Sequence, residues 1–158
     1  MPKERENPPM EKIDSNQFAK GQYRPHGHSE IFTGGEIIWI ETEGPFNLEA
    51  VIAINITRAH VLETSVPKGR YAYLNKWHRS AMMPMEALLE YGKGLQRDYA
   101  DKSKAPCAVA WIFPDDIEGG AMMRRHYERL FCDIAIPFSI FSDEEIALAW
   151  VRNQLNKK

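Results

Sequence analysis

The chain has 158 residues, a common length for one compact domain. Hydrophobic residues make up 44% and charged residues 27% of it, a composition that excludes an intrinsically disordered protein. The formal net charge of −2 provides no general basic field for nucleic acid, and two cysteines cannot form a disulfide framework. No apolar run reaches the roughly 20 residues that span a bilayer. We therefore expect a cytoplasmic protein that binds no nucleic acid and has no integral membrane segment.

The N-terminal part of the chain differs in composition from the rest. Residues 1–29 are polar and contain several prolines, and Phe18 and Tyr23 are isolated aromatic residues within them. Such a segment buries too little apolar surface to offset the entropy lost on ordering. The sequence therefore predicts a flexible or draped tail over residues 1–29 and one α/β domain over residues 30–158.

The predicted domain begins with a β-hairpin. Residues 31–33 and 36–42 have the composition of strands, and Gly34-Gly35 between them supplies the positive φ angles of a tight turn. Asn47 then predicts the start of a helix, because its side-chain oxygen can accept a bond from a free backbone amide of the first turn. Residues 50–57 are rich in β-branched side chains and also fit a strand. Whether residues 48–62 are wholly helical therefore stays open.

Strands and helices alternate in the remainder. Strands are predicted over residues 70–75, 105–113 and 137–141. Helices are predicted after Pro84, around residues 123–131, and after a capping box formed by Ser142 and Glu145. In the last helix the pattern turns Ile146, Ala149 and Trp150 inward. This order predicts an α/β fold with a mixed, mostly parallel sheet and flanking helices.

Three segments resemble the bacterial SpoIIAA-like proteins of the STAS-fold group. They are Glu-Gly-Pro-Phe-Asn at residues 43–47, Phe-Ser-Asp-Glu-Glu-Ile-Ala-Leu-Ala-Trp at residues 141–150, and Pro-His-Gly-His at residues 25–28. The resemblance covers roughly residues 25–155 and rests on structural motifs. It implies a sheet of four or five strands with flanking helices and an N-terminal hairpin. It also implies non-enzymatic work, because STAS domains bind a partner protein and are switched by phosphorylation of a serine after the middle strand.

The matching serine here is Ser80, the only hydroxyl in residues 76–84. The aspartate and glycine that accompany the family's serine are absent from this segment, which leaves the phosphorylation in doubt. His78 and Arg79 can pair with a phosphate on Ser80. Alternatively, the segment is a solvated turn in which Ser80 bonds to the local backbone.

Two further groups are candidates for binding. Trp77, Met82 and Met83 lie near a strand end and before a helix, where we expect them to be exposed. They then form either a partner-binding or homodimer face, or the lining of a groove for a small apolar ligand. Arg124 and Arg125 share a helix face that suits an acidic partner or a phosphate, although a solvated surface is the ordinary role of such a face.

The sequence provides little support for catalysis or metal binding. The five histidines are scattered and no paired cysteines accompany them, so no metal site is predicted. Asp115, Asp116 and Glu118 follow a predicted parallel strand, where carboxylates serve either as acid, base or cation ligand or as the charged start of a helix. No catalytic motif and no cofactor is identified. We therefore expect a non-catalytic STAS-like regulatory or protein-interaction module, with a binder or carrier of a small apolar or lipid-like ligand as the alternative.

Overall fold

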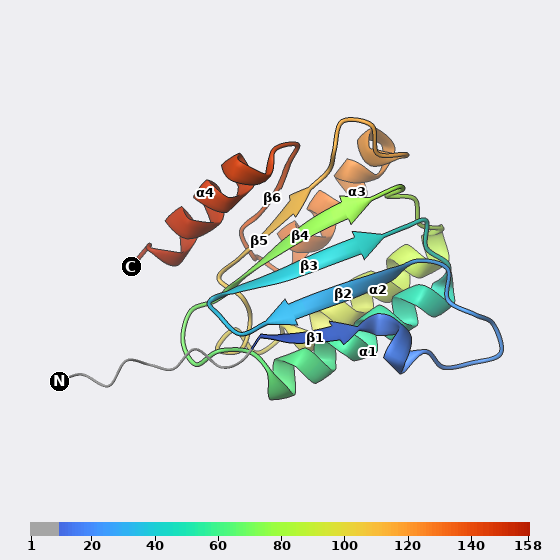
Figure 1. The fold of residues 1–158 in the computed structure, drawn as a ribbon, viewed down its shortest axis with the longest axis horizontal. Coiled ribbons are helices and arrows are strands. Elements are labelled where there is room, and N and C mark those ends of the chain that lie inside the picture. Colours follow the sequence, from blue (N-terminus) through green and yellow to red (C-terminus); the bar gives the residue numbers. More distant parts are fainter. Residues whose placement is uncertain (1–9) are drawn as a thin grey trace.

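The computed structural model describes residues 10–158 (Figure 1). Within this range the chain forms six strands, one short 3₁₀ helix and four α-helices. Their bounds in chain order are β1 Glu11–Asp14, η1 Ser15–Phe18, β2 His28–Thr33, β3 Ile37–Glu43, α1 Leu48–Thr64, β4 Ala72–His78, α2 Met85–Asp98, β5 Ala108–Ile112, α3 Gly120–Asp133, β6 Phe138–Phe141 and α4 Glu144–Leu155.

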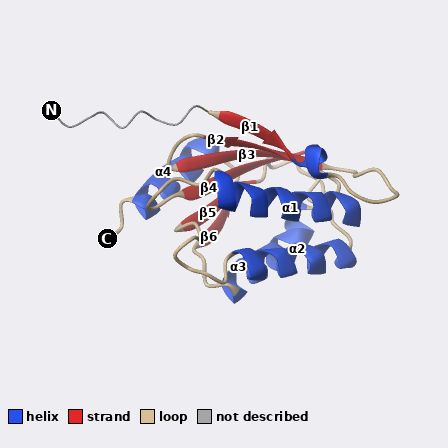
Figure 2. Ribbon diagram, turned by 90° about the horizontal axis from the view of Figure 1, so that it is seen from below, coloured by secondary structure: helices blue, strands red, loops and turns tan. Residues whose placement is uncertain are grey.

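The strands form one mixed sheet in the order β1-β2-β3-β4-β5-β6. Strands β1 to β3 pair antiparallel, and strands β3 to β6 pair parallel. Helices α1, α2 and α3 lie on one face of the sheet, whereas α4 lies on the other (Figure 2). The predicted α/β fold is thus confirmed, with six strands where four or five were expected.

The additional strand comes from the segment that the sequence analysis assigned to a tail. Strand β1 pairs with β2, so that Ile13 lies opposite Ile31, and the side chain of Ile13 is buried. Helix η1 follows, and its Phe18 ring packs 5.1 Å from the ring of His60 on α1. One buried aliphatic side chain on an edge strand leaves almost no periodic signal, which explains why composition alone missed this element. Residues 1–9 of the predicted tail lie outside the described residues.

The hairpin and the helix after it are confirmed. Strands β2 and β3 pair around a short turn in which Gly34 has a φ of 131°, a conformation that favours glycine. The ambiguous segment is helical throughout α1. The side-chain oxygen of Asn47 accepts hydrogen bonds from the backbone amides of Ala50, at 3.0 Å, and His26, at 2.9 Å. Asn47 therefore caps α1 and also fixes the loop before β2 against the start of the helix.

The start of α4 differs from the prediction by one residue. Asp143 is the N-cap, and its carboxylate accepts a bond from the amide of Ile146 at 3.1 Å. Ala147 and Val151 face the sheet, and the predicted inward residues Ile146 and Ala149 are exposed. Because one helical position rotates a side chain by about 100°, this small shift changes the buried face. Trp150 is half-buried and packs 5.6 Å from the Phe141 ring.

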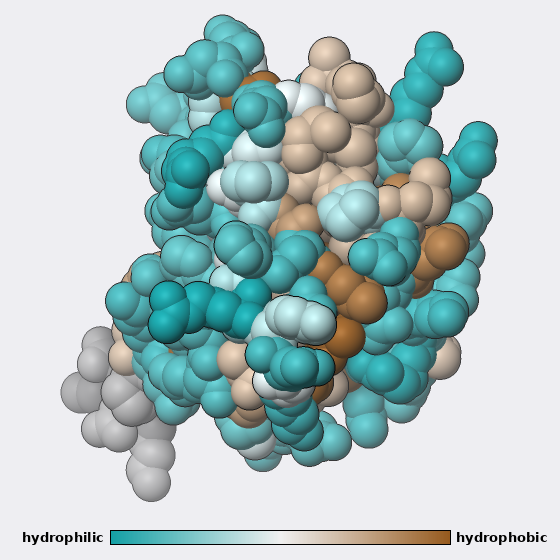
Figure 3. Space-filling model, turned by 90° about the vertical axis from the view of Figure 1, so that its right-hand side faces the viewer, coloured by the Kyte–Doolittle hydropathy of each residue, from teal (hydrophilic) through white to brown (hydrophobic). Residues whose placement is uncertain are grey.

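The two faces of the sheet have different cores. The core under α1, α2 and α3 is large and aromatic, whereas the buried residues under α4 are mainly alanines, together with Leu74, Ile112 and Val151. Figure 3 views the molecule from the side at which the parallel strands end, and hydrophobic side chains there form patches divided by hydrophilic ones. Within residues 10–158, no helix is both long and apolar enough to cross a membrane.

Candidate functional site

A cavity of about 60 Å³ lies between the sheet and helices α1 and α2. Strands β2 to β5 form one wall of the cavity, and the two helices form the opposite wall. Most of the lining side chains are aliphatic or aromatic, among them Ile31, Ile54, Leu95 and Trp111. The cavity therefore belongs to the larger of the two cores.

Three polar side chains of β4 line this cavity and have no hydrogen-bond partner there. They are Tyr73, Asn75 and Trp77, and the unpartnered atoms are the tyrosine hydroxyl, the asparagine Oδ1 and the indole Nε1. The residues are only 4%, 7% and 3% exposed, in that order. Alternate residues of a strand point to the same face, which places all three on the cavity side. Each unmade bond of a buried polar group costs about 1–3 kcal/mol.

A buried ion pair closes the cavity on the helix side. The Nε of Arg58 on α1 donates to a carboxylate oxygen of Asp98 on α2 at 3.0 Å. Its Nη2 donates to Oδ1 of Asn55 at 2.6 Å, and Nδ2 of Asn55 donates to the carbonyl of Glu90 at 2.8 Å. The guanidinium carbon lies 5.3 Å from the centre of the Tyr91 ring. The positive charge of Arg58 is therefore already balanced within the protein by Asp98.

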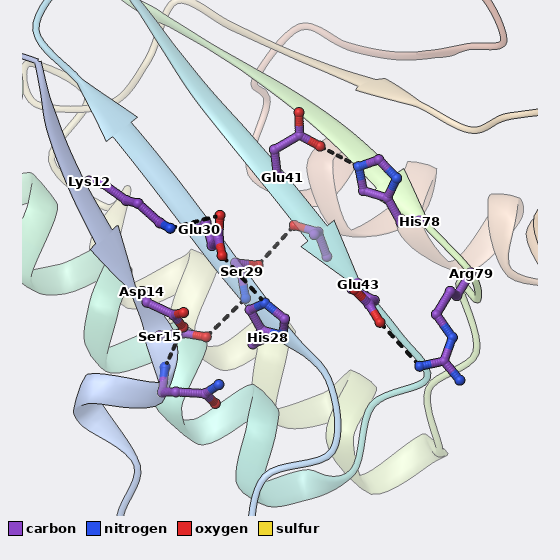
Figure 4. A network of polar contacts seen from close by, with 12 residues as sticks. Lys12, Asp14, Ser15, His28, Ser29, Glu30, Glu41, Glu43, His78 and Arg79 are labelled. Atoms are coloured by element: carbon purple, nitrogen blue, oxygen red, sulfur yellow. Dashed lines mark hydrogen bonds and ion pairs between the residues drawn. The ribbon is translucent and has the colours of Figure 1, made fainter.

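Hydroxyl groups form the end of the cavity nearest β1. The Ser29 and Thr42 hydroxyls form a hydrogen bond at 2.8 Å, and the Ser15 hydroxyl accepts from the Ser29 amide at 2.9 Å (Figure 4). All three residues are buried. Ser15 belongs to η1 and does not itself line the cavity, so the missed segment holds the backbone of β2 beside this end of the cavity.

Aromatic packing fixes the orientation of the unpartnered groups. The Trp77 ring lies 4.6 Å from the Trp111 ring and 5.4 Å from the Phe46 ring, centre to centre. The Tyr73 hydroxyl lies near those of Tyr71 and Tyr99 but meets neither in hydrogen-bond geometry. Burial raises the pKa of Tyr73 to about 12, against the opposing effects of the neighbouring Tyr99 hydroxyl and the Arg58 charge. Tyr73 therefore offers a neutral hydroxyl at physiological pH.

The predicted binding residues do not form one site in the structure. Trp77 and Met83 are buried and line the cavity, which contradicts their predicted exposure. The reason is that β4 continues to His78, so Trp77 takes a core-facing position of the strand rather than a place in a loop. Met82 is half-buried and packs against Gly119. The exposed methionines of this region are Met85 and Met122, although Met85 has the periodicity of a core residue.

His78 and Arg79 lie outside the cavity. His78 points to the opposite face of the sheet from Trp77 and contacts Glu41, and Arg79 forms an ion pair with Glu43 at 3.1 Å (Figure 4). Arg79 has a φ of 65°, the left-handed conformation with which the chain turns away from β4. These two residues therefore belong to a polar outer face of the sheet.

Ser80 is 3% exposed and fully engaged. Its hydroxyl donates to a carboxylate oxygen of Glu118 at 2.8 Å and accepts from the Met82 amide at 3.1 Å. The backbone at Ser80 and Glu118 also forms a parallel bridge beyond β4 and β5. Ser80 thus ties together the two loops at the ends of these strands.

The remaining candidates lie on the surface. Arg124 and Arg125 are exposed on α3, and Arg124 donates to the carbonyl of Ile140 at 3.4 Å. Asp115 and Asp116 are exposed in the turn after β5. Cys107 is half-buried, and burial raises the pKa of its thiol, which does not favour the reactive thiolate.

One cluster of potential metal ligands occurs among the described residues. Ligand atoms of Asp14, His28 and Glu30 lie within 4.8 Å of one another. Lys12 already forms an ion pair with Glu30 at 3.5 Å, and Asp14 accepts a bond from the amide of Asn16 at 2.9 Å. Local partners thus already engage both carboxylates of the cluster.

The sequence analysis missed Arg58 and Asn75, which line the cavity, and Asn55, which accepts a hydrogen bond from Arg58. Arg58 and Asn55 lie within a mainly apolar helix, and Asn75 lies between Leu74 and Lys76 on β4. A polar residue in a segment expected to be buried is the signal that could have identified them.

The fold and the cavity together define an α/β protein with a mixed six-stranded sheet and unpartnered polar groups at a cavity beside β4. No model of a known protein family, no curated protein and no solved structure matches the chain.

Proposed function

We propose that the protein is a non-catalytic binding module that takes up a small molecule in the cavity beside β4. The observation that carries this proposal is the set of three unpartnered polar atoms, on Tyr73, Asn75 and Trp77, which line one cavity. A few polar groups within a mostly apolar lining are typical of small-molecule sites. Folding alone gains nothing from these unmade hydrogen bonds, whereas a ligand that completes them gains affinity.

The volume of the cavity restricts the ligand. A cavity of about 150 Å³ accommodates benzene, and the cavity here has about 60 Å³. It therefore suits a molecule of about two to four non-hydrogen atoms and is too small for a lipid chain. Since very small ligands gain at most about 1.5 kcal/mol per non-hydrogen atom, the dissociation constant of a four-atom ligand would be no tighter than about 40 μM.

The resemblance to SpoIIAA-like proteins supports a regulatory use of this binding. In that role the module would act on a protein partner or on a second copy of itself, as STAS domains act on partners. The burial of Ser80 and its bond to Glu118 argue against a phosphoserine switch at this position. The exposed Arg124 and Arg125 suit an acidic partner surface.

Binding in the cavity can be followed by NMR through the indole N–H signal of Trp77. The protein has four tryptophans, and the Trp77 signal is assigned by its loss in Trp77→Phe. We expect acetamide or 2-propanol, each with four non-hydrogen atoms, to shift this signal in a saturable way. If no molecule of this size, neutral or charged, changes the Trp77 signal up to molar concentration, the proposal is wrong.

Two matched threonine variants test whether the cavity is the site. Thr57 and Thr64 both lie on α1, and each hydroxyl donates to the carbonyl four residues earlier. Only Thr57 lines the cavity. Thr57→Leu should fill part of the cavity and abolish the shift of Trp77, whereas Thr64→Leu should leave the shift unchanged. Equal binding by both variants would place the ligand elsewhere.

A further inference from the structure

We propose that the ligand of this cavity is a small uncharged amide; this inference rests on the proposed function and specifies its ligand. The ligand's carbonyl oxygen accepts a hydrogen bond from the Trp77 indole N–H, and its amide N–H donates to Oδ1 of Asn75. Both protein atoms are buried without a partner in the cavity wall.

The two side chains have complementary hydrogen-bonding capacity. An indole N–H only donates, so Trp77 requires an acceptor. The Oδ1 of Asn75 only accepts, so it requires a donor. A ligand that lacks either function leaves one of these buried groups unpaired. The hydroxyl of Tyr73 both donates and accepts, and it can therefore bond to either end of such a ligand.

The positions of the two residues favour separate donor and acceptor atoms on the ligand. Asn75 and Trp77 are two residues apart on one strand, so their Cα atoms are separated by about 6.6 Å. A single hydroxyl oxygen must lie within about 3 Å of both polar atoms to satisfy them. An amide spreads its acceptor and donor over two atoms and meets this spacing more easily.

The charges around the cavity favour a neutral ligand. Arg58 is the one charged side chain in the cavity wall among residues 10–158, and its guanidinium is already paired with Asp98. A carboxylate or an ammonium ion would therefore be buried without a free counter-charge, which is strongly unfavourable. An uncharged amide avoids this cost and retains both hydrogen bonds.

Four molecules of equal size test the contributions of the ligand's hydrogen-bond donor, acceptor and charge one at a time. Acetamide, 2-propanol, acetone and acetate each have four non-hydrogen atoms, and they differ in donor, acceptor and charge. We titrate each into the ¹⁵N-labelled full chain and follow the Trp77 indole signal. Acetamide should bind about tenfold more tightly than 2-propanol or acetone, and acetate should cause no saturable shift.

An asparagine variant identifies the residue that recognises the N–H of the amide. Asn75→Leu should weaken acetamide binding about tenfold, to the level of acetone, and should leave acetone binding unchanged. Asn153→Leu makes the same change at an exposed position of α4 and should leave both affinities unchanged.

The wild-type ranking decides the inference even where a variant fails to fold. Equal affinities for acetamide, acetone and 2-propanol, or tighter binding of acetate, would overturn the amide assignment and leave ligand binding in the cavity intact. The absence of any Trp77 shift with all four molecules would overturn both this inference and the proposed function.

Discussion

Two buried asparagines differ in whether their side-chain hydrogen bonds are made. Asn55 on α1 accepts from Arg58 and donates to the carbonyl of Glu90, so its amide is satisfied at both ends. Asn75 on β4 has an Oδ1 with no partner. The two residues have the same side chain and are both buried. Variants at the two positions therefore compare the destabilisation by an unmade hydrogen bond with the stabilisation by hydrogen bonds that are made.

We expect leucine at these two positions to have opposite effects on stability. In ligand-free buffer, Asn75→Leu should raise the free energy of unfolding by about 1 kcal/mol, because it removes an unsatisfied acceptor and adds apolar surface. Asn55→Leu should lower it by about 3 kcal/mol, because it leaves Arg58 and the Glu90 carbonyl without a partner. Urea denaturation measures both. If Asn75→Leu instead lowered the free energy of unfolding as much as Asn55→Leu, the Oδ1 of Asn75 would have a hydrogen-bond partner in the wild-type protein.

Single residues also show what the sequence could and could not predict. The cap at Asn47 was predictable because capping depends on a few neighbouring residues. The burial of Trp77 and Met83 was not predictable, since it depends on how far β4 extends and on which face α1 and α2 cover. Whether Asn75 has a partner depends on three-dimensional neighbours, which no local pattern encodes.

At the scale of elements, the contact between α1 and α2 depends on a glycine. A Cβ at Gly94 would overlap the side chains of Asn55 and Arg58, the two residues that hold the buried polar network. A Cβ at Gly92 would come 2.9 Å from a terminal methyl of Leu130, which is the far end of a flexible side chain. The two glycines lie in the same helix and are both buried.

Alanine at these two glycines should therefore have opposite effects. Gly94→Ala should lower the free energy of unfolding by about 2 kcal/mol, because the overlap with the network exceeds the gain in helix propensity. Gly92→Ala should be neutral or should raise it by up to about 1 kcal/mol, because Leu130 can move and alanine favours the helix. Urea denaturation of both variants provides the measurement. If the two variants show equal stability, the network does not require the close approach at Gly94.

The elements themselves were more predictable than their ends. The alternation of strands and helices identified β2 to β6, α2, α3 and α4, because each has a clear pattern or a clear breaker, whereas α1 was left open between helix and strand because its β-branched residues suit both. The predicted start of α4 was displaced by one residue because Ser142 and Asp143 are both good N-caps, and the structure uses Asp143. Strand β1 was missed because its stability comes from pairing with β2 rather than from its own composition.

At the scale of the whole molecule, the tyrosines are concentrated in the core under α1, α2 and α3. Five of the six are held in this layer, and burial is the largest cause that raises the pKa of each. They are Tyr71, Tyr73, Tyr91, Tyr99 and Tyr127. Only Tyr23 is largely exposed. The folded protein therefore keeps five phenols protonated at pH values at which the unfolded chain would release their protons.

This difference predicts cooperative unfolding in alkali. Below pH 10 the phenols are neutral in both states and stability does not depend on them. Above pH 10 each phenol that ionises only in the unfolded chain lowers the free energy of unfolding by about 1.4 kcal/mol per pH unit, and five lower it by about 7 kcal/mol per unit. For a total stability of about 5–15 kcal/mol, unfolding should occur between about pH 10.7 and 12.

Phenolate absorbance and circular dichroism, recorded together, test this expectation. The absorbance change of the five buried tyrosines should coincide with the loss of helical signal. Tyr73→Phe removes one of the buried phenols together with an unpartnered hydroxyl. It should therefore make the pH dependence less steep by about a fifth and move the midpoint to higher pH. If the five buried phenols ionised near pH 10 while the helical signal stayed intact, the core around the cavity would be open to solvent, contrary to the burial on which the proposed site depends.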